Sequence, residues 1–242
     1  MKITIVTVCR NCKDTIESTI SSVLEQTYQQ IEYIIVDGMS TDGTYEIVSN
    51  YANTVKVIHE QDSGIYDAMN KGINSATGEY IYFLNSGDIL ADREIIKKAA
   101  DIVLKEKPVL LCGNVNYVYS DGKVILHNYS SRKMLNFFNL AAGITVCHQA
   151  IFARMDIMKS KCFDTSYTLW ADQEFIAYCL NYKYKVVYLN EIICNFDAHG
   201  FSSGEDKRGI SRKECDRISK KYNRRWYLIF WIPKKMIRLL VK

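Results

Sequence analysis

The sequence DSGIYDAMNKGI, residues 62–73, is followed at short distance by EYIYFLNSGD, residues 79–88. The first stretch is typical of a helix that begins after an acid and a glycine. The second is an apolar run that ends in a small polar turn with one carboxylate, Asp88. Such a run indicates a strand buried in a packed sheet, and open α/β sheets bind ligands just beyond the carboxyl ends of their strands. The sequence therefore places Asp88 at a candidate ligand site.

Two further strand-like runs precede this unit, ITIVTV at residues 3–8 and EYIIVDG at residues 32–38. Apolar residues between them recur at helical spacing, and a short helical segment then leads to a third run, VKVI at residues 55–58. Strands that alternate with helices predict right-handed crossovers and a parallel sheet. We therefore expect an α/β fold in which three acids lie along one edge of the sheet: Asp37, Asp62 and Asp88.

In this order and spacing, the motifs VDGMSTDGT, DSGIYDAMNKGI and FLNSGD resemble the nucleotide-sugar half of the family 2 glycosyltransferases, which have the GT-A fold. The most similar branch is the bacterial one that builds colanic acid, O-antigens and capsules. The resemblance is dense over residues 3–88 and thinner afterwards. It implies a GT-A type, Rossmann-like and mostly parallel sheet with helices on both faces, followed by a mixed acceptor-side region and a basic aromatic tail.

The resemblance also implies a division of the chain. Residues 1–105 would form the nucleotide-sugar-binding half, and residues 106–223 would form the acceptor-binding half of the same domain, with the catalytic base. Residues 224–242 would form a membrane-associating tail. A chain of 242 residues can bury one substantial α/β core, which agrees with a single domain.

The implied activity is an inverting sugar transfer from a nucleotide-sugar donor. Asp37 matches the family position that binds the pyrimidine. A carboxylate can only accept hydrogen bonds, so it suits the imino N–H of uracil and favours UDP, although guanine also presents N–H donors. Asp88 matches the acid that holds Mn²⁺ or Mg²⁺ on the diphosphate, since these ions prefer oxygen ligands. Further donor-binding candidates are Thr7, Asp62, Asn70, Lys71, Asn85, His148 and Gln149.

One motif departs from the family pattern. The usual Asp-x-Asp element reads Asn85-Ser86-Gly87-Asp88, so only one carboxylate remains. Asn85 can hydrogen-bond a ribose hydroxyl or a metal-bound water, but it brings no charge. This departure predicts weak metal binding without nucleotide. It also leaves open a catalytically weak relative that binds nucleotide sugars without turnover.

The acceptor half contains Asp121-Gly122 between two strand-like runs, a pattern typical of a β-hairpin. In TLWADQEFIAYCL, residues 168–180, Asp172 opens a helical pattern where family members place their general base. Inversion by direct displacement needs one group to take a proton from the acceptor hydroxyl. We therefore predict Asp172 as the base, with Glu174 in reserve; the alternative is a helix-capping aspartate without a catalytic role.

Two segments near the C-terminus carry further predictions. FDAHGFSSG, residues 196–204, resembles the flexible lid that closes over the diphosphate, although loops of this composition are also ordinary connectors. RRWYLIFWIPKKMIRLLVK, residues 224–242, is aromatic with a basic fringe and too short in its apolar run to span a bilayer. This composition suits the headgroup region of an anionic membrane. Alternatively, the tail forms a terminal helix packed on the domain, or a dimer interface.

The resemblance implies acceptors that are sugars on a polyprenyl diphosphate at the inner leaflet. Because the sequence also lacks the pattern of a signal peptide, we expect a cytoplasmic protein, peripheral at the inner face of the cell membrane. The expected partners are the nucleotide sugar, the lipid-linked saccharide and the membrane surface, with no nucleic acid. The net charge of +4 and 48% hydrophobic residues agree with a mildly basic globular protein.

Two alternative functions remain, an oxidoreductase and a nucleotidyltransferase. Cys9-Arg10-Asn11-Cys12 is a CxxC pair between a strand and a helix, as in thioredoxin-like oxidoreductases, but that reading leaves the three edge acids unexplained. The eight cysteines otherwise lie mostly in apolar runs and indicate reduced core residues. A nucleotidyltransferase would be expected to carry a glycine-rich, basic phosphate loop after the first strand, where this chain has TVCRNCKD.

Overall fold

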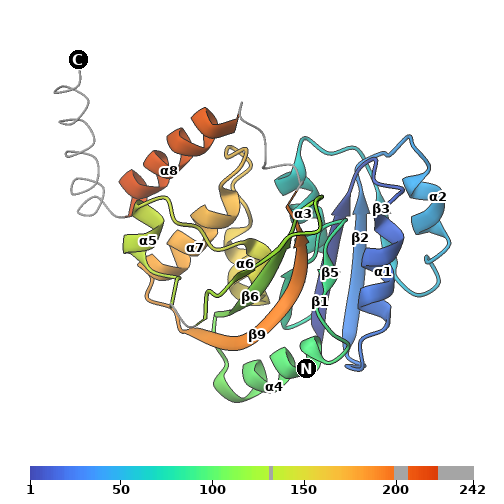
Figure 1. Cartoon of the computed structure of the whole chain (residues 1–242), viewed down its shortest axis with the longest axis horizontal. Coiled ribbons are helices and arrows are strands. Elements are labelled where there is room, and N and C mark those ends of the chain that lie inside the picture. The colour runs from blue at the N-terminus through green and yellow to red at the C-terminus, as the bar shows by residue number, and fades with distance from the viewer. Residues whose placement is uncertain (131–132, 199–206, 223–242) are drawn as a thin grey trace.

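The computed structural model describes residues 1–130, 133–198 and 207–222 (Figure 1). One sheet runs through this part of the chain in the order β3-β2-β1-β4-β8-β6-β9-β5, and β7 pairs with β6. The strands are β1 (Ile3–Cys9), β2 (Ile31–Asp37), β3 (Lys56–His59), β4 (Tyr80–Phe83), β5 (Ile89–Leu90), β6 (Leu110–Val118), β7 (Val124–His127), β8 (Ile151–Arg154) and β9 (Val186–Asp197). The helices are α1 (Ile16–Leu24), α2 (Thr44–Ser49), α3 (Ile65–Ser75), α4 (Ile95–Glu106), α5 (Phe137–Ala141), α6 (Met155–Lys161), α7 (Ala171–Asn181) and α8 (Arg208–Tyr222).

The first half of the chain forms a parallel sheet. β1 pairs in parallel with β2 and β4, and β2 pairs in parallel with β3. All residues of β1 are buried, so both of its faces are covered, as expected for a strand inside an α/β sheet. On one face α3 approaches so closely that a side chain at Gly72 would overlap Val6. The α/β fold with a Rossmann-like parallel core is therefore confirmed.

The second half extends the same sheet in a mixed arrangement. β8 is antiparallel to both β4 and β6, so β6 runs in the direction of β4, and β9 is parallel to β6. The expected hairpin is present as β6 and β7, with Gly122 in its turn at φ +80°. The short strand β5 of the first half pairs with β9 of the second. The two halves of the predicted division thus share one sheet, as Figure 1 shows by the long curved β9 beside β6.

This topology decides where the functional side chains can lie. Because β1, β2, β4 and β9 run in one direction, their carboxyl ends lie at one edge of the sheet. Asp37 ends β2, the Asn85–Asp88 turn follows β4, and Asp197 ends β9. The turn requires Gly87, whose φ of +96° lies in the left-handed region that favours glycine. The edge therefore gathers polar groups from both halves of the chain.

Within the described residues, no helix is long and apolar enough to cross a membrane. Two predictions concern residues outside the described ones: most of the predicted lid, residues 199–204, and the predicted membrane tail, residues 224–242.

Candidate active site

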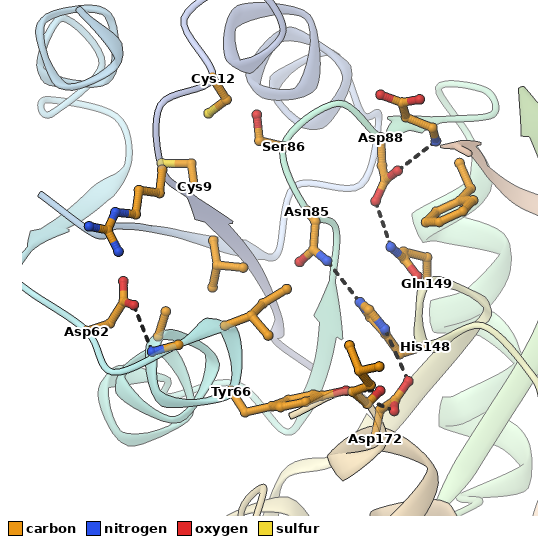
Figure 2. A pocket seen from close by; sticks show the side chains of 18 of the residues that line it. Cys9, Cys12, Asp62, Tyr66, Asn85, Ser86, Asp88, His148, Gln149 and Asp172 are labelled. Atoms are coloured by element: carbon orange, nitrogen blue, oxygen red, sulfur yellow. Dashed lines mark hydrogen bonds and ion pairs between the residues drawn. The ribbon is translucent and has the colours of Figure 1, made fainter. Parts of the chain in front are cut away.

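A pocket of about 410 Å³ opens at this edge of the sheet (Figure 2). Its walls come from the end of β1, the start of α3, the turn after β4, the 3₁₀ turn His148–Ala150 and the start of α7. The pocket brings together six of the predicted site residues: Asp62, Asn85, Asp88, His148, Gln149 and Asp172. They come from both halves of the chain, so the pocket is the place where the two halves can act on one ligand.

Asp88 lies on the inner side of this pocket and is only 2% exposed. One carboxylate oxygen accepts a hydrogen bond from Gln149 Nε2 at 2.8 Å, and the other accepts the backbone N–H of Asp197 at 3.0 Å. Burial raises the pKa of Asp88 to about 6, although both hydrogen bonds act in the opposite direction. The two hydrogen bonds of Asp88 therefore offset only part of the cost of burying its charge.

Asp197 is a fourth acid of the pocket, beside Asp62, Asp88 and Asp172, and the sequence interpretation did not single it out. A Cβ at Gly87 would lie 3.3 Å from Asp197 Oδ2, so this carboxylate lies against the Asn85–Asp88 turn. The charge of Asp197 contributes to the raised pKa of Asp88. Asp197 could have been predicted by the argument used for Asp37, because each is an acid at the end of a strand that runs in the direction of β1.

Asp172 faces the same pocket from the first turn of α7 and is 8% exposed. Its carboxylate contacts the Tyr66 hydroxyl at 3.1 Å and accepts the backbone N–H of Gln173 at 2.8 Å. The N-cap position of α7 belongs to Trp170, so Asp172 is not the capping residue that the alternative interpretation required. The side chain is held in place by several partners while it still borders the pocket.

His148 links Asp172 to the turn after β4. Its Nδ1 lies 3.3 Å from Asp172 Oδ2, and its Nε2 lies 3.1 Å from Asn85 Nδ2 (Figure 2). Since Asn85 Nδ2 can only donate, Nε2 accepts and Nδ1 carries the proton that points to Asp172. Asn85 Oδ1 is buried without a hydrogen-bond partner among the described residues. An unsatisfied acceptor in a ligand pocket is free to receive a hydroxyl or a water from a ligand.

The start of α7 is fixed from another helix. Glu214, on α8, accepts the backbone N–H groups of three successive residues at 2.7, 2.9 and 3.0 Å: Thr168, Leu169 and Trp170. The Leu169 carbonyl in turn accepts a hydrogen bond from the Tyr66 hydroxyl at 2.7 Å. A helix N-terminus needs acceptors for its free backbone N–H groups, and the carboxylate of Glu214, distant in sequence, provides them before α7. Glu214 thus stabilises the segment that carries Asp172.

A second cavity of about 350 Å³ adjoins the first, and Asp172 lines both. Both cavities share His148, Gln149, Leu169, Asp172 and Phe196. The second one also has aromatic walls from Tyr117 and Trp170, and Lys207 and Arg208 from the beginning of α8 line it. Asp172 therefore borders both cavities, as a group that acts on two substrates must.

Comparisons with known proteins agree with this arrangement. Residues 4–160 match the family described as Glycosyl transferase family 2. The chain belongs to glycosyltransferase family 2. A PGL/p-HBAD biosynthesis glycosyltransferase from Mycobacterium bovis is 28% identical over 210 residues, which are 84% of this chain and 80% of the relative. The putative teichuronic acid biosynthesis glycosyltransferase TuaG from Bacillus subtilis is 41% identical over 90 residues, 36% of each chain.

Solved structures share the fold at low sequence identity. The S. aureus TarS fragment 1-349 in complex with UDP-GlcNAc matches with a TM-score of 0.72 and 19% identity, over 92% of this chain and 68% of that fragment. Glucosyl-3-phosphoglycerate synthase from Mycobacterium tuberculosis, solved with Mg²⁺ and UDP, matches with a TM-score of 0.64 and 16% identity, over 91% and 79%. The GT-A fold expected from the motifs is confirmed, and the family assignment disfavours the oxidoreductase and nucleotidyltransferase alternatives.

Four predicted donor-binding residues of this family 2 glycosyltransferase do not line the pocket. Thr7 is fully buried and bonds to the Tyr33 hydroxyl and the Leu84 carbonyl. Asn70 makes two hydrogen bonds to the backbone of Phe163, and Lys71 contacts Gln61 and Glu60 beside α3. Asp37 is buried at the end of β2, where it contacts His59 Nδ1 at 2.6 Å and Ser40.

These positions divide into two groups. Thr7 and Asn70 hold the strands and the loop before α7 together, so their contacts are structural. Asp37 adjoins the pocket through Cys9, a lining residue whose sulfur lies 3.7 Å from Asp37 Oδ1. The carboxylate of Asp62, another lining residue, lies against Gly38, the residue after Asp37. Asp37 therefore remains a prediction for base recognition at the margin of the pocket.

The reserve base, Glu174, faces away from both cavities. It is fully buried and pairs with Lys161 at 2.9 Å and Lys221 at 2.7 Å, and it accepts a hydrogen bond from the Tyr222 hydroxyl at 2.5 Å. These partners lower the pKa of Glu174 against the opposing effect of its burial. A carboxylate so paired ties α6, α7 and α8 together, and it cannot reach an acceptor hydroxyl in either cavity.

The raised pKa of Asp88 predicts how stability varies with pH when divalent cations are removed. Unfolded Asp88 loses its proton near 3.8 and folded Asp88 near about 6, so the folded state binds more protons between these values. The free energy of unfolding should therefore fall as pH rises through this window, by about 3 kcal/mol. Thermal unfolding in EDTA at pH 4 to 7 should show this slope in the wild type and its loss in Asp88→Asn. Asp92→Asn, outside the pocket, should keep the slope; equal slopes in wild type and Asp88→Asn would refute the assignment.

Proposed function

We propose that this protein transfers a sugar from a UDP-sugar to a hydroxyl group of a saccharide acceptor, with inversion at the anomeric carbon and Asp172 as the general base. The observation that carries the proposal is that the Asp172 carboxylate lines both of two adjoining cavities. The first cavity contains the acids and the Asn85–Asp88 turn that suit a nucleoside diphosphate. The second has the aromatic walls that suit a sugar acceptor.

The chain's own residues prepare the base for one proton transfer. His148 and Tyr66 contact the Asp172 carboxylate and fix its orientation. Because Asp172 lines the second cavity, one of its carboxylate oxygens can take the proton of an acceptor hydroxyl while the oxygen of that hydroxyl attacks the anomeric carbon. A single base is sufficient for an inverting displacement, because the leaving diphosphate needs charge neutralisation rather than protonation.

A divalent cation, Mn²⁺ or Mg²⁺, fits the residues present. Asp88 and Asp197 supply carboxylate oxygens to the same pocket, and burial raises the pKa of Asp88, so a nearby cation would stabilise its charged form. Among the described residues no three His, Cys, Asp or Glu side chains form a metal cluster, so nucleotide oxygens would complete the coordination. When bound, the cation would neutralise the charge that develops on the diphosphate. Asp197 would thus replace the carboxylate that the family carries in the position of Asn85.

For the acceptor we propose a sugar on a lipid-linked diphosphate, at the inner face of the cell membrane, in the synthesis of a bacterial surface polysaccharide. Trp170 and Tyr117 can stack against sugar rings, and Lys207 and Arg208 bring cationic groups to the same cavity. The relative named for teichuronic acid biosynthesis supports a saccharide polymer as the acceptor class.

A donor screen tests the proposed function. Purified protein is incubated with UDP- and GDP-sugars, with Mn²⁺ or with EDTA, and the products are separated. We expect release of nucleoside diphosphate from at least one UDP-sugar, only with the cation, and an inverted anomeric configuration in the transferred sugar. Release of pyrophosphate would identify a nucleotidyltransferase instead. Nucleotide binding without any product would identify the catalytically weak relative.

A prediction concerns the tail, residues 224–242, which lies outside the described residues. Its aromatic run and basic fringe should bind anionic membranes, at about 1 kcal/mol for each basic residue near the surface. Truncation after Asn223 should therefore release the protein from anionic liposomes in a sedimentation assay, while hydrolysis of the donor continues. Vesicles of neutral lipid serve as the control for both proteins. Equal binding of truncated and intact chains to anionic liposomes would exclude the tail as the anchor.

A further inference from the structure

Cys9 and Cys12 both line the donor pocket, and the proposed transfer reaction uses neither sulfur atom (Figure 2). Cys9 is the last residue of β1, and Cys12 follows after a turn in which Asn11 has a left-handed φ of +52°. This turn brings both side chains to the same wall of the pocket. Cys9 is buried whereas Cys12 is partly exposed, so a reagent in the pocket can reach Cys12 first.

The two thiols contact each other and differ in their chemistry. The Cys9 thiol donates a hydrogen bond to Asp37 Oδ1 at 3.7 Å. The contacts of Cys12 with Cys9 and with Ser86 lower the pKa of Cys12 to about 7, against the opposing effect of burial. The contact with Cys12 and burial raise the pKa of Cys9. Burial instead raises the pKa of the Cys112, Cys162 and Cys179 thiols. A thiolate beside a protonated thiol is the arrangement that makes a cysteine pair reactive.

We propose that Cys9 and Cys12 form a reversible redox-modification site, at which a hydroperoxide converts the pair to a disulfide and thereby weakens nucleotide binding. The Cys12 thiolate attacks the peroxide oxygen, and the O–O bond breaks to give a sulfenic acid and a hydroxide or alkoxide. The Cys9 sulfur then attacks the Cys12 sulfur and displaces the sulfenic oxygen as water. The pair loses two electrons and two protons, the peroxide is reduced to water or to water and an alcohol, and a dithiol reverses the reaction.

The consequence for the pocket follows from bond lengths. A disulfide holds its sulfur atoms at about 2.05 Å, much closer than a hydrogen bond does. The Cys12 sulfur must therefore move toward Cys9 and away from the Ser86 hydroxyl that donates to it. Ser86 belongs to the Asn85–Asp88 turn and also contacts the Thr15 hydroxyl at 3.2 Å. Oxidation thus removes one support of the turn that the proposed donor site needs; this second effect rests on the proposed function.

The test treats the full chain with hydrogen peroxide and maps its cysteines by mass spectrometry without reduction. We expect a Cys9–Cys12 disulfide to form before Cys162 is modified. The dissociation constant for UDP, titrated with Mn²⁺, should rise by at least about tenfold on oxidation and return to its starting value with dithiothreitol. In Cys12→Ser, peroxide should change the UDP affinity by less than about twofold, whereas the control Cys162→Ser should respond as the wild type does. In Cys9→Ser, a dimedone probe should trap the sulfenic acid at Cys12.

Two results would overturn the proposal. One is modification of Cys12 that is no faster than that of Cys162, with no dimedone adduct in Cys9→Ser. The other is a complete disulfide with an unchanged UDP affinity. If the reduced protein binds no UDP, the proposed donor is wrong, and the disulfide map together with the dimedone adduct still decides whether the modification site exists.

Discussion

Asp172→Asn should lower the turnover number by about 10² to 10⁴, the usual contribution of general-base catalysis. Asparagine has the same shape and keeps an acceptor oxygen for Tyr66, which contacts the carboxylate at 3.1 Å. It cannot take a proton from the acceptor. Steady-state kinetics should therefore show a loss in kcat, while the affinity for UDP, measured by calorimetry, stays within about twofold of the wild type.

A matched control is Asp156→Asn. Asp156 also lies in the first turn of a helix, α6, but it is exposed and pairs with Arg154. We expect full activity from this variant, since surface ion pairs contribute about 0 to 1 kcal/mol and nothing to the chemistry. An Asp172→Asn enzyme within a few-fold of the wild type would move the base to another group. Glu174 would not be that group, because its ion pairs with Lys161 and Lys221 hold it outside both cavities.

Asp88→Ala should abolish cation-dependent turnover and leave the protein folded. The fold survives because the substitution removes a buried carboxylate, whose pKa of about 6 already reflects the cost of its charge in that position. Asn85→Asp should keep or tighten metal binding, since it restores the carboxylate of the family's usual motif. Activity with a Mn²⁺ titration and circular dichroism of each variant measure the two effects separately.

Asp92→Ala provides the control for this series. Asp92 follows the same turn in the sequence, but its carboxylate accepts the backbone N–H of Glu94 at 2.7 Å, outside the pocket. It should retain the wild-type dependence on Mn²⁺. If the wild-type enzyme turns over at its full rate in excess EDTA, the cation has no role and the assignment of Asp88 falls with it.

The fold was predictable because a run of apolar residues indicates a buried strand. ITIVTV corresponds to a strand with every residue buried, and the run at residues 55–58 differs from β3 by one position. The hairpin at Asp121-Gly122 followed from its turn chemistry. The insertion of β8 between β4 and β6 was not foreseen, since antiparallel partners from distant parts of a chain leave no local pattern.

The site was predictable where a side chain follows a strand whose direction is known. Asp88 and Asp172 were found in this way or through their motif, and both reached the pocket. Asn70 did not, because helical position alone does not tell which face turns to the ligand; its amide instead bonds to Phe163, far away in sequence. Asp197 was missed because its strand ends in a segment interpreted only as a lid. Glu214 could not be found at all, since it stabilises α7 from a separate helix.

The most direct test of the central claim is the position of the nucleotide and its cation in a crystal of the protein grown with UDP and Mn²⁺. The proposed function predicts UDP in the pocket of about 410 Å³ and an anomalous manganese peak in contact with carboxylate oxygens of Asp88 and Asp197. Asp172 should then lie beyond the terminal phosphate, facing the second cavity. UDP bound at another surface, or a manganese peak remote from both carboxylates, would contradict the account.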